Sequence, residues 1–233
     1  MASWMIHLRV ADALLDLIPG LSPTEFVVGN IAPDSGIPND DGISFTPSTV
    51  ISHFKLDSSI LKSIYIPSFV DQYFTKHHQL SYSREEYSFF LGYLSHLLTD
   101  QLWVESAVAP LKERYPEQWN ADRNALIARA KEDWYDLDFL YIKNHPDFRA
   151  FSIYSNAVGF QNSYLDFFSS DAFDARREYI TSFYRSANDN LERPYIYFTE
   201  QAAQSFVLSA SSTIHLLLRE KYCECWHLFP AHA

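Results

Sequence analysis

The chain has 233 residues, of which 47% are hydrophobic, and this suits one domain with a sizeable core and speaks against a disordered chain. Its formal net charge is −11 and it has no long basic run. A nucleic-acid-binding protein needs clustered lysines and arginines, so no nucleic-acid partner is expected. The chain has only 6 glycines, whereas sandwiches and barrels need many turns, and this favours helices. No stretch approaches the roughly 18–20 apolar residues that span a bilayer, so we expect no transmembrane segment.

The first predicted element is a helix over residues 3–18. Its apolar positions share one face, and Arg9, Asp12 and Asp16 lie on the other. These charges distinguish it from the apolar core of a signal peptide, so the cytoplasm is the expected location. Residues 22–54 contain four of the eleven prolines and show no clear periodicity. We predict that they form a long ordered loop over a functional site.

The strongest predicted helix covers residues 83–105. Ser83 and Glu86 have the spacing of a capping box, and the segment YSFFLGYLSHLLTDQLW is apolar nearly all round, which indicates a central, buried helix. Other helices are predicted over residues 58–77, 119–140, 172–189 and 196–221, whereas residues 145–170 fit no clear pattern. Because no linker or repeat is visible, we predict an all-α, single-domain helical bundle over residues 1–233, with residues 221–233 as a loose tail.

His96 and Asp100 are the first candidates for chemistry, because they stand four residues apart on this helix and share a face. A buried carboxylate is costly without a partner, and a divalent cation is one partner that histidine and aspartate commonly bind. The alternative is a His–Asp hydrogen bond that only stabilises the core. His7, on the inward face of the first helix, favours the metal, although a single inward histidine is more often a core residue.

Asp34 and His53 lie in the predicted loop. Pro33 stiffens the approach to Asp34 and would hold its carboxylate in a fixed position, although an Asx-turn into Ser35-Gly36 is an equal alternative. His53 taken alone is typical of a surface histidine. Taken together, the inward histidines and carboxylates predict a divalent metal site.

Four segments of the chain resemble the zinc-dependent phospholipase C family, above all its small intracellular bacterial members. They are SWMIHLRVADALL, FVVGNIAPDSG, STVISHF and FFLGYLSHLLTD, within residues 3–103. Metal ligands in that family follow the order His, Asp, His and then His-x3-Asp on a helix, which corresponds here to His7, Asp34, His53, His96 and Asp100. The resemblance implies the helical fold of that family and one ion held by the last four residues. It also implies that a second ion would use His7, with Asp100 as the bridge.

The chain also departs from the secreted phospholipases. Those enzymes bind zinc through the amino group of an N-terminal tryptophan, whereas Trp4 is internal here. They have a His-x3-Glu soon after the aspartate, and this chain has none. A three-metal site is therefore not expected. His145 and His215 are left as residues that could complete a second site, with an ordinary core histidine as the alternative.

A metal-bound water is a nucleophile near neutral pH, so the predicted function is a metal-dependent hydrolase, specifically a phosphoesterase. One or two divalent ions are expected, zinc first and Mn or Fe as alternatives. By the resemblance, Asp34 is also catalytic and accepts a proton from the attacking water. The expected partner is a small phosphorylated substrate, although no Arg or Lys cluster lies beside the ligands in sequence. The alternative function is a non-catalytic helical domain with a structural metal. Nothing in the sequence fixes the oligomeric state.

Overall fold

The computed structural model describes residues 1–41, 44–57, 63–186, 188 and 190–223. Within these residues helices dominate, and the one sheet is a two-stranded antiparallel ribbon, which confirms the all-α prediction. The helices are α1 (Trp4–Leu17), α2 (Pro23–Ile31), α3 (Thr49–Ser52), α4 (Ile66–Tyr73), α5 (Lys76–Ser81), α6 (Arg84–Trp103), α7 (Ala109–Arg114), α8 (Pro116–Asn144), α9 (Arg149–Asn156), α10 (Ala172–Arg185) and α11 (Glu200–Leu217). A 3-10 helix, η1 (Ala32–Asp34), two π-helical turns, η2 (Val104–Val108) and η3 (Leu218–Tyr222), and the strands β1 (Ile37–Pro38) and β2 (Phe45–Thr46) complete the described elements.

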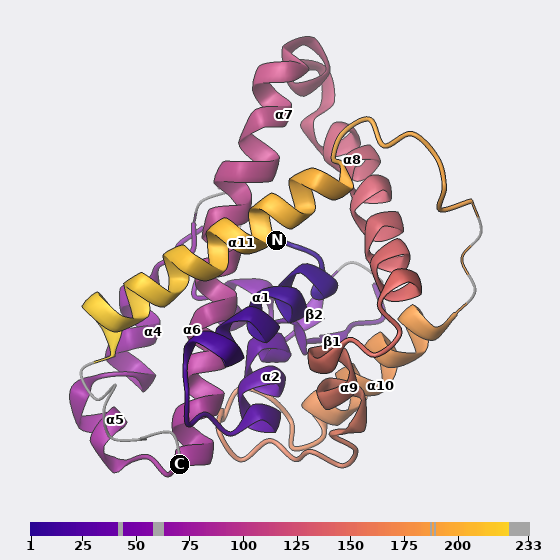
Figure 1. Cartoon of the computed structure of the whole chain (residues 1–233). Helices are drawn as coiled ribbons and strands as arrows, with labels where there is room; N and C mark the ends of the chain where they lie inside the picture. Colours follow the sequence, from indigo (N-terminus) through magenta and orange to yellow (C-terminus); the bar gives the residue numbers. More distant parts are fainter. Residues whose placement is uncertain (42–43, 58–62, 187, 189, 224–233) are drawn as a thin grey trace.

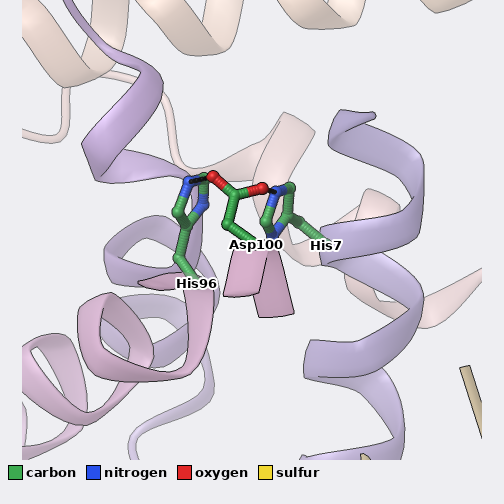
Figure 2. A group of neighbouring side chains, drawn as sticks. All are labelled: His7, His96 and Asp100. Atoms are coloured by element: carbon green, nitrogen blue, oxygen red, sulfur yellow. Dashed lines mark ion pairs between the residues drawn. The ribbon is translucent and has the colours of Figure 1, made fainter. Parts of the chain in front are cut away.

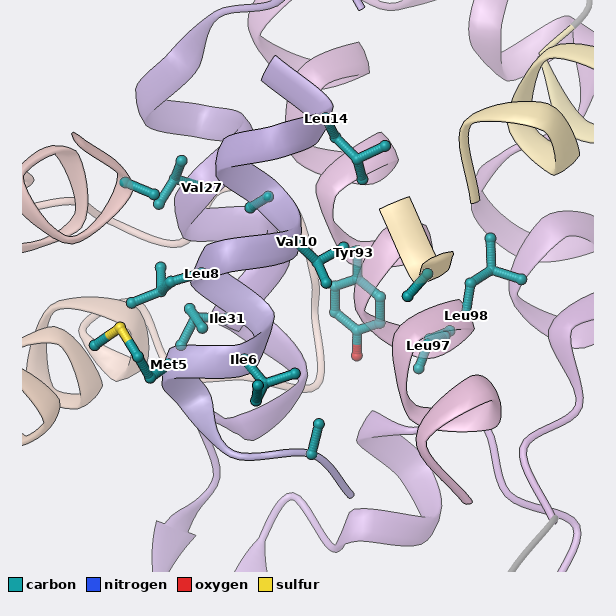
Figure 3. Close-up of a cluster of buried hydrophobic side chains, with 14 of the residues drawn as sticks. Met5, Ile6, Leu8, Val10, Leu14, Val27, Ile31, Tyr93, Leu97 and Leu98 are labelled. Atoms are coloured by element: carbon teal, nitrogen blue, oxygen red, sulfur yellow. The ribbon is translucent and has the colours of Figure 1, made fainter. Parts of the chain in front are cut away.

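Helix α6 is the central element, with α1 and α2 beside it and α11 crossing over α1 and α6 (Figure 1). The predicted capping box is present at its start, because the Ser83 side chain accepts from the Glu86 amide and the Glu86 side chain accepts from the Ser83 amide. Every residue from 87 to 100 is buried, as the all-round apolar pattern predicts. Figure 3 shows the core that α1, α2 and α6 form together. None of the described helices combines the length and apolar character needed to cross a bilayer.

Two glycines let α2 and α6 pack backbone against backbone. A Cβ on Gly92 would lie 2.1 Å from the Phe26 carbonyl oxygen, and one on Gly29 would lie 2.2 Å from the Phe89 carbonyl oxygen. No residue other than glycine allows this approach without moving a helix. The contact brings the end of α2, with η1 after it, against the middle of α6, one turn before His96.

The structure differs from the sequence prediction over residues 22–54. Residues Pro23–Ile31 form helix α2, so the prediction of an irregular loop was wrong there. Pro23 occupies the first turn of the helix, where its missing N–H is no loss, and the helix is buried from Phe26 to its end. A short helix buried on all sides has no amphipathic pattern to reveal it. The loop that remains, with the β1–β2 ribbon, lies beside the site described below.

The remaining predicted helices agree with the structure more closely. Helices α1, α8, α10 and α11 correspond to the predictions over 3–18, 119–140, 172–189 and 196–221. The predicted helix over 58–77 starts outside the described residues and then divides into α4 and α5, while residues 145–170 contain α9. Of the predicted tail, residues 224–233 lie outside the described residues, and Cys223 is buried.

Candidate metal centre

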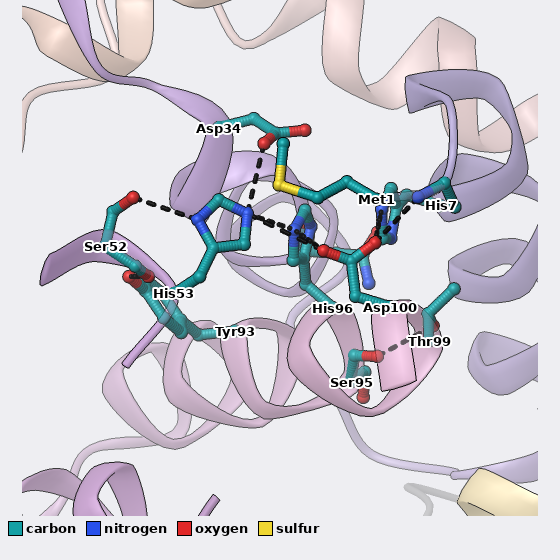
Figure 4. Close-up of polar contacts among 12 residues, drawn as sticks. Met1, His7, Asp34, Ser52, His53, Tyr93, Ser95, His96, Thr99 and Asp100 are labelled. Atoms are coloured by element: carbon teal, nitrogen blue, oxygen red, sulfur yellow. Dashed lines mark hydrogen bonds and ion pairs between the residues drawn. The ribbon is translucent and has the colours of Figure 1, made fainter. Parts of the chain in front are cut away.

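The five residues predicted as ligands come together where α1, η1, α3 and α6 meet (Figures 2 and 4). His7 comes from α1, Asp34 ends η1, His53 is the C-cap of α3, and His96 and Asp100 come from α6. All three histidines are fully buried and Asp100 is 1% exposed. The Asp34 side chain, at 8%, is the most exposed of the set. The structure therefore brings the five residues together, with Asp34 at the outer edge.

Neighbouring donor atoms of this cluster lie at distances typical of two ligands bound to one small ion. His53 Nε2 lies 3.2 Å from Asp34 Oδ1 and 3.2 Å from His96 Nε2. Asp100 Oδ2 lies 3.7 Å from His53 Nε2 and 3.6 Å from His96 Nε2. Ligand atoms bound at about 2.0–2.2 Å in a tetrahedral site are roughly 3.3–3.6 Å apart. The observed distances are close to that range without an ion to impose them.

Hydrogen bonds at the Nδ1 atoms of His96 and His53 orient both imidazole rings so that their Nε2 atoms face the centre of the cluster. His96 Nδ1 lies 2.7 Å from the Asn30 carbonyl oxygen, which can only accept, so Nδ1 carries the proton and Nε2 carries a lone pair. His53 Nδ1 lies 3.0 Å from Ser52 Oγ, and Tyr93 OH donates to the Ser52 carbonyl oxygen. Such outer contacts orient metal-binding histidines and fix their tautomer.

The count of protons inside the cluster falls short of the count of acceptors. His96 Nε2 and the two carboxylates are acceptors. The Ala2 amide donates to Asp100 Oδ1 at 2.7 Å, and the ring nitrogens that could offer a further proton are His53 Nε2 and His7 Nε2. Asp100 Oδ2 has no hydrogen-bond partner among the described residues. Buried acceptors of this kind are normally satisfied, and a bound cation is one group that could satisfy them. The His and Asp donor set fits zinc.

His7 extends the cluster on the α1 side. Its Nε2 lies 3.4 Å from Asp100 Oδ1, and its ring stacks on His96 with a centroid distance of 3.8 Å (Figure 2). Neither ring nitrogen of His7 makes a hydrogen bond with the described residues. Asp100 thus directs Oδ1 toward His7 and Oδ2 toward His53 and His96, the arrangement that a carboxylate bridging two ions needs. His7, His96 and Asp100 form one group spaced for an ion, and Asp34, His53 and His96 form another.

Burial and hydrogen bonding put these side chains in the protonation states that a metal requires. Burial lowers the pKa of His96 to about 3, so this imidazole is neutral near pH 7. Burial alone would raise the pKa of Asp34, but the hydrogen bond with His53 and the electrostatic interactions with the three neighbouring histidines together more than offset it and bring the pKa below its ordinary value. A neutral imidazole and an ionised carboxylate can both bind a cation without first losing a proton.

A pocket of about 130 Å³ opens beside the cluster, and Asp34 and Ser52 are part of its wall. The wall also carries two cations, Lys131 of α8 and Arg176 of α10, that the sequence did not connect with the site. Aromatic rings beside them come from Trp4, Phe45, Trp134 and Tyr135. An adjoining groove of about 520 Å³ shares Trp4, Tyr135 and Arg176 and is lined mainly by apolar and aromatic side chains. No local sequence pattern relates these residues, because only the packing of α8 and α10 brings them to the ligands.

Residues 6–103 match the model of the zinc-dependent phospholipase C family. The resemblance seen in the sequence is thereby confirmed for this part of the chain. All five candidate ligands fall within the matched residues, whereas Lys131, Tyr135 and Arg176 lie beyond them. No curated protein and no solved structure shows significant similarity to the chain. The matched family consists of metal-dependent hydrolases, in agreement with the His and Asp groups found here.

The two histidines left open by the sequence do not join the cluster. Among the described residues, neither His145 nor His215 belongs to a group spaced to hold an ion. His145 is exposed at the end of α8, where its Nδ1 lies 2.8 Å from the Tyr141 carbonyl oxygen. His215 lies near the end of α11.

Proposed function

We propose that the chain is a metal-dependent phosphoester hydrolase, with zinc as the first candidate ion. The ligands would be Asp34, His53, His96 and Asp100, with His7 and Asp100 available for a second ion. The observation that carries this proposal is the convergence of buried lone pairs at ligand spacing, beside an open pocket with cations in its wall. The match of residues 6–103 to a family of zinc-dependent enzymes supports it.

The chemistry would follow from the position of Asp34 at the edge of the pocket. A bound ion lowers the pKa of its water and stabilises charge on a phosphoryl oxygen. Asp34 would hold that water and accept its proton, because Oδ1 faces His53 whereas no hydrogen bond within the described residues occupies Oδ2. His53 would keep the carboxylate in place during this transfer. The buried rings of His7 and His96 exclude bulk water from the inner side.

The walls of the pocket support an anionic substrate with an apolar part. Lys131 and Arg176 bring positive charge to a chain of net charge −11, and the adjoining groove offers aromatic rings. A small phosphoester of an apolar or aromatic alcohol would place its phosphoryl group near Asp34 and its alcohol in the groove. Aryl phosphates are therefore the first substrates to assay.

Metal analysis tests the centre directly. We expect protein purified without chelator, or reconstituted with Zn²⁺, to hold one or two ions per chain. His96→Ala and Asp100→Ala should lose this binding, whereas His145→Ala, at an exposed histidine outside the cluster, should retain it. Wild-type protein that holds no stoichiometric metal after reconstitution with zinc, manganese or iron would refute the proposed centre.

Turnover tests the reaction. We expect the metal-loaded protein to hydrolyse an aryl phosphomonoester or phosphodiester, and we expect Asp34→Asn to lower kcat by about 100-fold or more, since positioned proton acceptors contribute 10²–10⁴-fold. If the loaded protein turns over no phosphoester, the result would favour the second candidate function, a helical domain with a structural metal. The short distances among the His and Asp donors are the observation in its favour, because a coordination sphere closed by four protein ligands would leave no position for water.

A further inference from the structure

Arg176 stands out among the residues of the pocket wall because its guanidinium is held in place without a carboxylate. Its Nη2 donates to the carbonyl oxygen of Gly36, and its charge faces the rings of Tyr179 at 5.4 Å and Trp4 at 5.8 Å. Within the described residues it makes no ion pair. A guanidinium has five N–H donors, and the Gly36 carbonyl accepts the one hydrogen bond that Arg176 makes within the described residues, so further donors are available to a ligand in the pocket.

The next residue on α10 makes the contrast clear. Arg177 is paired with Asp174, with Nε 2.6 Å from Oδ1, and its Nη1 lies 3.3 Å from the Ser155 carbonyl oxygen. Arg177 is not part of the pocket wall. Helix α10 therefore carries two neighbouring arginines in different states. Arg177 is paired with a carboxylate, whereas Arg176 lies in the pocket wall without one.

Arg176 is also tied to the segment that carries the candidate ligand. Gly36 follows Asp34 by two residues, so the hydrogen bond to its carbonyl fixes the guanidinium relative to the Asp34 carboxylate. Both residues line the same pocket. A phosphoryl group near Asp34 would meet a planar, pre-positioned fork of donors, which is the geometry that binds phosphate oxygens in pairs.

We infer that Arg176 is the anchor for an anionic phosphoryl oxygen and thus a specificity-determining residue supplied from outside the matched segment. This inference rests on the proposed phosphoesterase function. Lys131 adds a second positive charge to the same pocket, but it is exposed and has no hydrogen bond or ion pair with the part of the chain that the structure describes. Lys131 therefore attracts anions, while Arg176 sets where and in which orientation the phosphoryl group binds.

Binding of inorganic phosphate to the zinc-loaded protein, measured by calorimetry, tests the anchor without relying on turnover. We expect Arg176→Met to weaken phosphate binding about tenfold or more, since it removes a charge-assisted pair of hydrogen bonds. Arg176→Lys keeps the charge but not the fork, so it should weaken binding by a smaller factor. Arg177→Met is the matched control on the same helix and should bind phosphate as wild type does. Zinc content should stay unchanged in all three variants.

Unaltered phosphate affinity in Arg176→Met, or no phosphate binding by the loaded wild type, would overturn the anchor. Loss of zinc in both Arg176 variants would also overturn it, because Arg176 would then act by holding the Gly36 segment and not the substrate. A separate failure marks the proposed function: a wild type that binds phosphate through Arg176 yet hydrolyses no phosphoester. If turnover is found, Arg176→Met should raise KM with a smaller effect on kcat, as expected for a binding residue.

Discussion

The two parts of this chain build the site by different kinds of packing. In residues 1–103, α2 and α6 meet backbone against backbone at Gly29 and Gly92. His96 and Asp100 lie on α6 and Asp34 follows α2, while His7 of α1 and His53 of α3 lie beside them. All five are buried except for the edge of Asp34. A metal centre needs its donors within a few tenths of an ångström of the right place, and direct backbone contact provides that rigidity.

The later part of the chain, from α8 to α11, packs through large rings and ion pairs. Phe139 contacts Phe183 and Tyr184 with ring centroids 5.1 and 5.5 Å apart. Arg193 joins Asp133 and Asp136, each at 2.7 Å. This part supplies no candidate ligand, but it supplies most of the cations and rings of the pocket wall. The earlier part thus positions the candidate ligands, and the later helices form much of the pocket wall beside them.

Gly92→Ala gives the largest expected effect, because it disrupts the close packing of α2 on α6. The new Cβ would meet backbone atoms of α2 at 2.1 Å from the Phe26 carbonyl oxygen and 2.8 Å from the Asn30 amide nitrogen, and backbone cannot rotate away. We expect a loss of about 3 kcal/mol or more in the free energy of unfolding, the upper end for overpacking. Displacing Asn30 also removes the support of His96, so zinc content should fall.

Gly159→Ala is the matched control from the later part of the chain. Its Cβ would meet nothing within 4 Å, although φ is +74°. Only the cost of a left-handed backbone applies, about 1–2 kcal/mol, and zinc content should not change. Urea unfolding and metal analysis of both variants give the comparison. Equal losses of stability and metal in the two variants would show that close packing of α2 on α6 has no special role.

Asp138→Asn tests the boundary between the two parts. Asp138 lies on α8 and accepts hydrogen bonds from Ser3 Oγ at 2.9 Å and Tyr184 OH at 2.7 Å. Burial raises its pKa from 3.8 to about 7, against the effect of these hydrogen bonds. Between pH 4 and 7 the folded protein therefore holds a proton that the unfolded chain has lost. Raising the pH through this window removes up to about 1.4 kcal/mol of stability per pH unit, and nothing further is lost above it.

The asparagine variant has no such proton to lose. Its free energy of unfolding relative to wild type should therefore rise between pH 5 and 7 and then level off, as measured by urea unfolding of metal-free protein. His96 acts in the opposite sense, because its pKa of about 3 makes stability fall as pH drops below 6.5. The difference between the two proteins cancels this effect. A difference that does not change with pH would mean that Asp138 is already ionised in the fold.

How much of the fold the sequence predicts depends on whether an element carries a local signal. Helix α6 was predicted because Ser83 and Glu86 form a capping box and its apolar run is long. Helix α2 was missed because it is short, begins at a proline and is buried on nearly all sides, so no period distinguishes it from a loop.

The candidate site follows the same rule. His96 and Asp100 could be paired from their spacing on one helix, and His7 from the inward face of its helix. Asp34 and His53 were weak candidates on local grounds, and the family resemblance joined all five in one ligand order. The sequence did not predict Arg176 or Lys131 as part of the site, because their place in the pocket depends on how α8 and α10 pack against the elements that carry the candidate ligands. A contact between distant segments produces no pattern in the sequence of either segment alone.

Arg149→Ala has the smallest expected effect. Arg149 of α9 pairs with Asp12 at 2.8 Å and Asp16 at 2.7 Å, but its side chain is 45% exposed and that of Asp16 is 68% exposed. Exposed ion pairs contribute about 0–1 kcal/mol and weaken with salt, so the free energy of unfolding should fall by less than about 1 kcal/mol. Arg193→Ala is the informative contrast, because the Asp133 side chain is only 4% exposed and would be left buried without its partner. We expect Arg193→Ala to cost more than Arg149→Ala in urea unfolding at both low and high salt. The reverse order would mean that the exposed ion pairs of Arg149 with α1 stabilise the fold more than the partly buried ion pairs of Arg193 within the later part of the chain.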